Sequence, residues 1–400
     1  MLMQTLHGYS LDETQWIAKG GGGQCNVAIK GGKEYFIKRL TKPKYPESDK
    51  FSGAFRQQKI EECDTWLKRR KDIMKALPGN GTGTLIKPIE YFRDGPCFYE
   101  ISNMVDVTSI PYDQIWKESK IDKARIMLTV AMSLADVHKV RVVHGDLDPQ
   151  NILISRAAGG NLITKLIDFT DAFFAQDPPD VIMSKDFWWS PEVALYSKAS
   201  EQKPNPYREY ITCKADVFSL GIVFHQYCSK GGKAPICTKP QPWQEFQIGK
   251  KPVIDPEIEP EFRDLIASML EVEPDDRPSM EDVHKTLLTI LRPTSGLGGT
   301  ESQKTEIGIR RKSEENVQNE KNDDALRKAE LDKKRNRDSD NTGIAAGSGK
   351  SSNGSHVTSA ILLNPRKVKV CFSDGKEQIM DLKLAIRQGY DISLRKHQEI

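Results

Sequence analysis

The chain has 400 residues, which is enough for two ordinary domains or for one large domain with appendages. Its formal net charge is +3 at pH 7, so composition indicates no general attraction to nucleic acid. The seven cysteines are scattered without a C-x-x-C pair, which argues against a zinc site or a disulfide framework. The N-terminus is too polar for a signal peptide, and no apolar run approaches the roughly 20 residues of a membrane span. We therefore expect a cytoplasmic protein without a membrane span.

Residues 1–105 predict mainly strands. The segment KGGGGQCNV at residues 19–27 is rich in glycine, whose backbone can approach phosphate groups closely, and it leads into a strand. Gly31 and Gly32 supply a two-residue hairpin turn between this strand and the next one, EYFIKRL. One helix is expected at about residues 51–77, where IEECDTWLKRRKDIM has the apolar spacing of a helix.

Residues 106–292 predict a mostly helical part with two short strands. Its candidate catalytic residues lie in VVHGDLDPQNILI, at residues 142–154, and in KLIDFTDAFF, at residues 165–174. Phosphoryl transfer from ATP needs a carboxylate near the attacking hydroxyl and hard oxygen ligands for Mg²⁺. Asp146 and Asn151 lie on one loop, and Asp168 closes a short apolar strand, so these segments supply both requirements.

Composition changes after residue 292. Residues 293–355 are rich in Lys, Glu, Asp, Asn, Ser and Gly, and they bury too little apolar surface to offset their ordering entropy. We expect a disordered linker there. Residues 356–400 contain alternating segments typical of strands, with a hairpin turn at residues 373–375. This last part predicts a small β element.

The ordered pattern H-x-D-x-x-x-x-N followed by D-F resembles the protein-kinase-like superfamily. HGDL, in place of H-R-D-L, also resembles the aminoglycoside and choline phosphotransferases, which act on small molecules. WWSPEV at residues 188–193, KADVFSLGIVFHQY at 214–227 and EVEPDDRPSMEDV at 271–283 resemble protein kinase motifs that those enzymes lack. The resemblance, which covers about residues 8–292, is therefore to bacterial-type, eukaryotic-like Ser/Thr protein kinases. It implies a buried ion pair between Glu192 and Arg277.

The resemblance implies an α+β fold with two lobes. The small lobe would occupy residues 8–105 and the large lobe residues 106–292, followed by the linker at 293–355 and the small C-terminal β element at 356–400. The implied reaction transfers the γ-phosphoryl group of ATP to Ser or Thr hydroxyls of a protein substrate, with Mg²⁺ as cofactor. A pseudokinase scaffold and a small-molecule phosphotransferase stay open as alternatives, and the C-terminal element is open to a protein partner.

The resemblance also assigns roles to single residues. Asp146 acts on the substrate hydroxyl, and Asn151 and Asp168 hold Mg²⁺. Two lysines compete for the α- and β-phosphates of ATP, because the kinase string V-A-I-K stands at residues 27–30. Lys30 belongs to the strand that leaves the glycine loop, so Lys38 on the next strand takes the nucleotide role.

A carboxylate from the following helix is expected to hold Lys38 in place. Glu61 and Glu62 are adjacent in that helix. Glu62 has Ile60 and Trp66 at the positions that an inward-facing glutamate requires, so it is the preferred residue.

Further residues implied to bind the nucleotide are Gly20 and Gly22 in the glycine loop, Val27 and Phe36 above the adenine, Leu153 below it, and Asn103 and Val105 at the hinge.

The chain departs from the kinase pattern in four places. Gly145 replaces an arginine that normally binds a phosphate on the activation segment, so no such phosphate should be needed. Thr170 replaces the glycine of D-F-G. Asp148 replaces a lysine that would neutralise the γ-phosphate. Lys185, from the segment that closes over the loop, can neutralise Asp148 and donate to the transferring phosphoryl group, although Asp148 can equally serve a local turn.

The strand order predicts different outcomes at the two lysines. Lys38→Met should abolish phosphoryl transfer, because the phosphates lose their cationic partner, whereas Lys30→Met should leave most of it. Radiolabelled ATP and a protein substrate would measure both rates. Loss of activity in the Lys30 variant alone would show that the glycine loop has been placed on the wrong strand.

Overall fold

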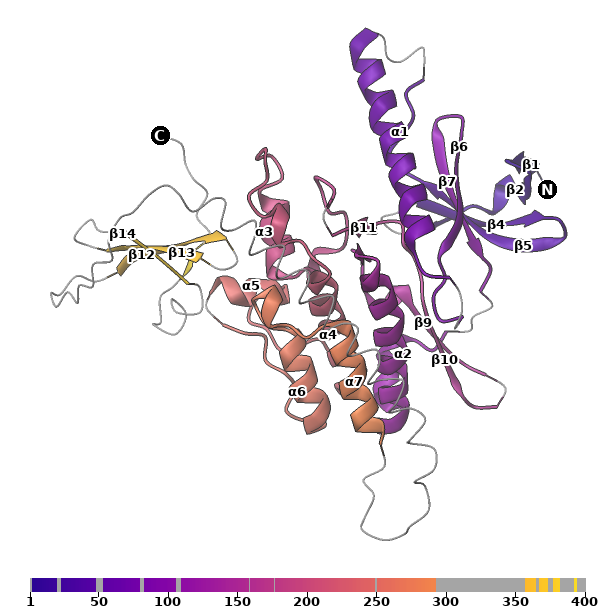
Figure 1. Ribbon diagram of the computed structural model, residues 1–400. Coiled ribbons are helices and arrows are strands. Elements are labelled where there is room, and N and C mark those ends of the chain that lie inside the picture. Colours follow the sequence, from indigo (N-terminus) through magenta and orange to yellow (C-terminus); the bar gives the residue numbers. More distant parts are fainter. Residues whose placement is uncertain are drawn as a thin grey trace, which may run out of the picture. The chain divides into compact units, whose positions relative to one another are not determined.

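The computed structural model describes eight segments up to residue 292 and four strands beyond residue 356 (Figure 1). The segments are residues 2–19, 23–47, 53–79, 83–105, 109–157, 159–175, 177–248 and 250–292. The linker expected at 293–355, the glycines Gly20 and Gly22, and the turn expected at 373–375 lie outside the described residues.

An antiparallel sheet forms the first part of the chain, as expected (Figure 1). Its strand order is β1-β2-β4-β5-β7-β6, and β3 pairs with β4. The strands are β1 (Met3–Leu6), β2 (Tyr9–Asp12), β3 (Ile17–Lys19), β4 (Gly23–Lys30), β5 (Lys33–Leu40), β6 (Pro88–Asp94) and β7 (Cys97–Asn103). Because β1 already pairs with β2, the sheet begins before residue 8.

The hairpin between β4 and β5 has the turn that the sequence predicts. Gly31 and Gly32 have φ angles of 59° and 75°, a backbone region that suits glycine, and Lys30 is paired with Lys33. The Lys30 side chain is 44% exposed and lies over the Tyr9 ring, whereas Lys38 is only 8% exposed. Lys38 is therefore the buried lysine of this hairpin.

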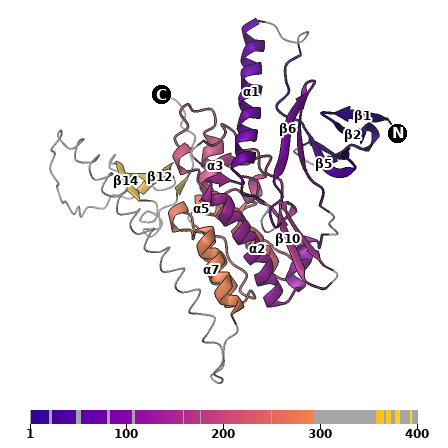
Figure 2. The same cartoon turned by 45° about the vertical axis from the view of Figure 1, so that its right-hand side comes forward.

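Helix α1 (Gly53–Ala76) runs beside the sheet (Figures 1 and 2) and confirms the helix expected at about residues 51–77. Its buried residues are Cys63, Arg70 and Ile73, which recur at helical spacing. Trp66 adds an aromatic contact to Phe98 of β7, with 5.1 Å between the ring centroids. These residues define the face of α1 that packs inward.

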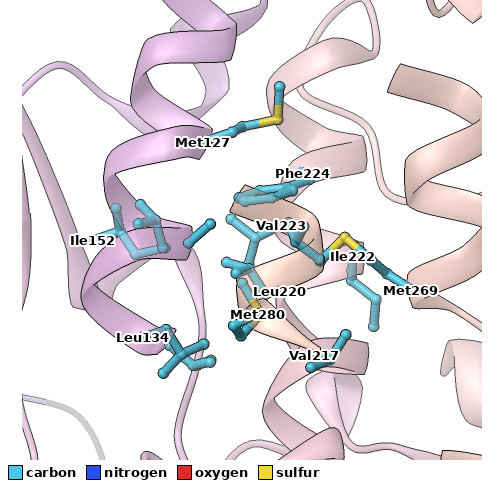
Figure 3. Packing of buried hydrophobic residues seen from close by; sticks show 14 of the residues in the cluster. Met127, Leu134, Ile152, Val217, Leu220, Ile222, Val223, Phe224, Met269 and Met280 are labelled. Carbon is cyan, nitrogen blue, oxygen red and sulfur yellow. The ribbon is translucent and has the colours of Figure 1, made fainter. Parts of the chain in front are cut away.

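The large lobe is a set of helices around one hydrophobic core. The helices are α2 (Lys120–Lys139), α3 (Pro191–Lys198), α4 (Lys214–Cys228), α5 (Pro242–Gln247), α6 (Pro260–Met269) and α7 (Met280–Leu291). Met127 and Leu134 of α2 and Val223 and Phe224 of α4, a helix that is buried along most of its length, belong to this core (Figure 3). Helices α2 and α7 run side by side (Figure 2). The core thus fixes α4 as the central helix of the lobe.

Short elements connect these helices. Strand β8 (Val142–Val143) pairs with β11 (Phe173–Phe174), and β9 (Ile152–Arg156) pairs with β10 (Leu162–Leu166). The 3₁₀ turns are η1 (Glu13–Gln15) in the small lobe, then η2 (Tyr112–Lys117), η3 (Pro149–Asn151), η4 (Asp186–Trp188), η5 (Arg208–Tyr210) and η6 (Pro274–Asp276). The two small strand pairs bracket the loop that carries Asp146 and the strand end that carries Asp168.

The expected pair of Glu192 and Arg277 is confirmed. Two parallel hydrogen bonds of 2.7 and 2.8 Å join the guanidinium to the carboxylate, and both side chains are completely buried. Arg277 also donates to the backbone carbonyls of Glu271, Val272 and Lys214, so every side of the charge is satisfied. The pair fixes the start of α3 against the segment before α7.

The C-terminal strands form a sheet of their own. Its order is β14-β13-β12-β15, built from β12 (Val357–Asn364), β13 (Lys367–Phe372), β14 (Glu377–Asp381) and β15 (Ile392–Ser393). The antiparallel pairing of β13 with β14 agrees with the predicted β element. Among the described residues of the whole chain, no helix has the length and hydropathy that crossing a membrane requires.

Candidate active site

The buried Lys38 on β5 contacts Asp168, which follows β10. Nζ of Lys38 lies 3.1 and 2.9 Å from the two carboxylate oxygens of Asp168. Burial alone would lower the pKa of Lys38, but the carboxylates of Asp168 and Glu100 outweigh it and raise that pKa above its ordinary value. Burial opposes ionisation of Asp168 too, yet Lys38 and the Thr170 hydroxyl lower its pKa. The pair is therefore held in its charged form.

Asp168 has an unusual backbone conformation. Its φ of 64° lies in the left-handed region, which residues other than glycine seldom adopt. Such a conformation costs about 1–3 kcal/mol and persists only where the surrounding contacts impose it. Here the Ile167 amide donates to the Asn151 carbonyl and Lys38 holds the carboxylate, so the conformation aims Asp168 at the lysine.

Asp146 and Asn151 meet on the loop after β8. The Asn151 amide donates to the backbone carbonyl of Asp146, at 2.7 Å, and to its carboxylate, at 3.2 Å. Burial raises the pKa of Asp146, and the carboxylates of Asp148 and Asp168 raise it further, while His144 and Lys185 oppose the rise. A carboxylate with a raised pKa is a better proton acceptor at neutral pH.

Asp216 of α4 holds the same loop by its backbone. Its carboxylate accepts from the amides of His144, at 2.7 Å, and Gly145, at 3.1 Å. Nε2 of His138 on α2 lies 2.9 Å from the same carboxylate. These bonds tie the loop to the central helix of the large lobe.

Gly145 occupies a place where a side chain would collide with its neighbours. Its φ is +79°, and a Cβ atom there would lie 2.8 Å from the Asp171 carbonyl and 3.0 Å from the Phe173 ring. Both values are below ordinary contact distances. The arginine that protein kinases commonly carry at this position could not enter without moving the segment after Asp168.

Asp148 and Lys185 are in contact. The Lys185 ammonium, which is half exposed, bonds to the buried carboxylate of Asp148 and lies 3.3 Å from the Gln150 side chain. The other oxygen of Asp148 accepts from the Gln150 amide at the start of η3. Asp148 therefore serves a local turn and pairs with Lys185 at the same time.

The prediction that Glu62 of α1 holds Lys38 in place is wrong. Glu62 is on the exposed side of the helix, its side chain is 47% exposed, and its carboxylate accepts from Lys59 and Gln58. Glu61 accepts from Gln57 in the same way. The inward face of α1 instead carries Cys63 and Arg70, so the choice made from neighbouring apolar residues selected the wrong helical face.

Two buried residues near Lys38 were missed in the sequence. Glu100 on β7 is the cross-strand partner of Lys38, is 5% exposed, and accepts from the Tyr91 and Thr170 hydroxyls. Arg70 of α1 donates to the backbone carbonyls of Thr170 and Ala172. The available signal was an acidic residue inside the apolar run CFYEIS, which a buried strand rarely contains without a partner.

The other residues expected around the nucleotide lie on the same sheet and on β9. Val27 and Phe36 are cross-strand partners, so their side chains share the sheet face that also carries Lys38. Asn103 ends β7 and accepts from Lys33, and Val105 follows it, partly buried. Leu153 lies on β9 between the buried Ile152 and Ile154 and points to the opposite face.

The donor set fits Mg²⁺, which usually takes one or two protein carboxylates together with phosphate oxygens and water. Asp168 already presents both carboxylate oxygens to a cation, Lys38. Asp146, Asp168 and Asp171 are close enough for their charges to act on one another. Within the described part of the chain, His, Cys, Asp and Glu form no cage of three or more. A metal held here would thus depend on the substrate for further ligands.

A small antiparallel lobe has a buried strand lysine in contact with Asp168, and Asp168 lies close to a loop with Asp146 and Asn151. This arrangement defines the class of phosphotransferases that share the kinase fold. A family model described as the protein kinase domain matches residues 12–288. The chain belongs to the protein kinase family. The motifs around Glu192, Asp216 and Arg277 fit this family rather than the small-molecule phosphotransferases, which are not favoured.

Curated relatives support the assignment. The chain is 27% identical to the serine/threonine-protein kinase ULK3 of Xenopus laevis over 38% of its own length and 30% of that protein. It is 27% identical to calcium-dependent protein kinase 27 of Arabidopsis thaliana, over 56% of this chain and 45% of the relative. It is 29% identical to the serine/threonine-protein kinase unc-51 of Caenorhabditis elegans, over 42% of this chain and 20% of the relative. The chain spans less than half the length of these relatives.

The packing around Gly145 predicts the effect of adding a side chain there. Gly160 has nearly the same φ, +81°, but open space around it, so it is a matched control. Gly160→Ala should cost roughly 1–2 kcal/mol for the backbone alone. Gly145→Ala should cost about 1–3 kcal/mol more, because the methyl group overlaps Asp171 and Phe173. Urea unfolding measures both, and equal losses would contradict the crowding seen in the structure.

Proposed function

We propose that this protein is an ATP-dependent kinase that phosphorylates Ser or Thr hydroxyls of protein substrates. The observation that carries the proposal is the contact of Lys38 with Asp168, since it joins the small lobe to the segment after β10. The Ile167 amide of that segment bonds in turn to Asn151, on the loop that bears Asp146. The printed names of two relatives, ULK3 and unc-51, as serine/threonine-protein kinases support the substrate class.

Each residue then has a distinct task. Asp146 orients the substrate hydroxyl and accepts its proton, a role that suits its raised pKa and its hydrogen bond from Asn151. Lys38 binds the α- and β-phosphates. Asn151 and Asp168 would hold Mg²⁺, which supplies neutralisation of the phosphate charge.

The sheet face that carries Lys38 supplies the nucleotide pocket in this proposal. Val27 and Phe36, paired across β4 and β5, cover the adenine from above, and Leu153 covers it from below. Backbone groups of Asn103 and Val105, at the end of β7, bind its edge. Gly20 and Gly22 approach the phosphates. Binding is thus divided between apolar contacts for the base and charged contacts for the phosphates.

Lys185 takes over the task of the lysine that Asp148 displaces. It neutralises the Asp148 carboxylate, which would otherwise repel the triphosphate, and its remaining N–H groups can donate to the transferring phosphoryl group.

We further place the reaction in the cytoplasm, because the scattered cysteines fit a reducing compartment, and we assign the C-terminal sheet to contact with a protein partner.

Replacing the proposed base tests the function directly. The full-length protein should transfer label from γ-labelled ATP to proteins of a cell lysate, and Asp146→Asn should lower that rate by about 10²-fold or more while it still binds a fluorescent ATP analogue. Asp136→Asn, at the exposed Asp136 of α2, is the matched control and should behave as wild type. Nucleotide binding without any transfer by the wild-type protein would favour the pseudokinase alternative.

The pairing of Lys185 with Asp148 is tested by a double-mutant cycle. Lys185→Ala and Asp148→Ala should each lower kcat more than they weaken nucleotide binding, and the combined loss should be far smaller than the sum. The same cycle on the surface pair of Lys251 and Glu271 is the control, with little effect on kcat. Additive losses at Lys185 and Asp148 would assign Asp148 to the turn alone.

A further inference from the structure

The proposed reaction leaves four polar groups around Lys38 without a task, of which three are buried and one is partly buried. Tyr91 and Glu100 come from neighbouring strands of the sheet, Arg70 comes from α1, and Thr170 follows Asp168 by two residues. A buried carboxylate is costly unless it is paired and hydrogen-bonded. Glu100 lies between the buried Tyr99 and Ile101, so its presence in this strand calls for a function that offsets that cost.

Glu100 occupies a defined place relative to Lys38. The two residues are directly opposite each other in the pairing of β5 with β7, so their side chains leave the sheet on the same face. Glu100 accepts hydrogen bonds from the Tyr91 hydroxyl, at 2.7 Å, and from the Thr170 hydroxyl, at 2.9 Å. Burial raises the pKa of the Glu100 carboxyl, and the ammonium of Lys38 opposes that rise because the two groups are close enough to act on each other.

Thr170 links the two charges. Its hydroxyl oxygen lies 3.0 Å from Nζ of Lys38, 2.9 Å from Glu100 and 2.7 Å from Asp168. A hydroxyl has one proton to donate, so it can accept from Lys38 while it donates to one of the two carboxylates. Glycine, which protein kinases commonly have at this position, could not make this link.

We propose that Glu100 is the positioning residue of Lys38, acting through Thr170 in place of a glutamate from α1. The proposal rests on the nucleotide role of Lys38 and on the metal role of Asp168. If Asp168 held Mg²⁺, its oxygens would be shared with the metal, and Glu100 would be the carboxylate that keeps the buried ammonium of Lys38 in place for the phosphates. Glu62, at the exposed surface of α1, cannot provide that charge.

Helix α1 contributes a cation rather than an anion. Arg70 donates to the carbonyl of Thr170 and, at 2.7 Å, to the carbonyl of Ala172. It therefore fixes the backbone on both sides of Asp171, while its guanidinium balances part of the buried negative charge. The helix positions the segment after Asp168, and β7 supplies the carboxylate. The sequence had led us to expect the carboxylate from the helix.

Glu100→Gln is the sharpest test, because the amide oxygen can still accept from Tyr91 and Thr170 while the charge is lost. A charged hydrogen-bonded contact contributes roughly 1.5–3 kcal/mol, so the Kd of a fluorescent ATP analogue should rise about ten- to a hundredfold, with a parallel fall in kcat/KM. Glu34→Gln, at an exposed residue of β5, is the matched control and should match wild type.

Thr170 gives an independent variant pair. Thr170→Ser keeps the hydroxyl and should keep nucleotide affinity, whereas Thr170→Val keeps the shape and should lose about as much affinity as Glu100→Gln. Because both changes break the same link, the double variant should be hardly weaker than either single one. This pair keeps the test decisive if Glu100→Gln does not fold.

The outcomes separate a positioning role from a packing role. If Glu100→Gln only lowers the thermal unfolding midpoint and binds the analogue as tightly as wild type, the proposal is overturned. A loss of affinity in Glu62→Gln instead of Glu100→Gln overturns it equally. Nucleotide binding is measured without catalysis, so the role of Glu100 is tested independently of phosphoryl transfer. A wild-type protein that binds the analogue but transfers no phosphoryl group would refute the proposed function, and the affinities of the Glu100 variants would still decide the positioning role.

Discussion

A buried positive charge on β5 is the constraint around which the two lobes are arranged. Lys38 is nearly inaccessible to water, so its ammonium must be surrounded by anions and acceptors from the protein. The large lobe supplies Asp168 and Thr170, and the small lobe supplies Glu100. Because these groups come from segments far apart in the chain, satisfying one charge fixes the position of the segment after β10 relative to the sheet.

The catalytic loop depends on a second set of buried charges in the large lobe. Asp216 holds the loop backbone from the central helix, and the pair of Glu192 with Arg277 holds the start of α3. Both sets follow the same rule, in which a buried ion is acceptable because each of its bonding positions has a partner. Asp146 and Asn151 are thus positioned by buried residues of the large-lobe core.

The departures from the kinase pattern are consistent with one another. Thr170 is matched by the buried Glu100, Asp148 by Lys185, and Gly145 by the close approach of Asp171 and Phe173. A substitution that would be unfavourable alone is acceptable here because a residue distant in sequence meets the altered charge or volume. Such matched changes indicate a site whose residues still fit one another, rather than one whose arrangement has been lost.

The sequence by itself determined the elements and the order of the motifs. Periodicity located the hairpin, the single helix of the small lobe and the strands near the C-terminus, and the distinction between Lys38 and Lys30 followed from the local turn at Gly31 and Gly32, because turn geometry is set by neighbouring residues. Which face of α1 turns inward was decided only by the tertiary structure. That face depends on packing against Phe98 and on the carbonyls after Asp168, so no pattern within the helix could show that Glu62 points to solvent and that the carboxylate beside Lys38 comes from β7.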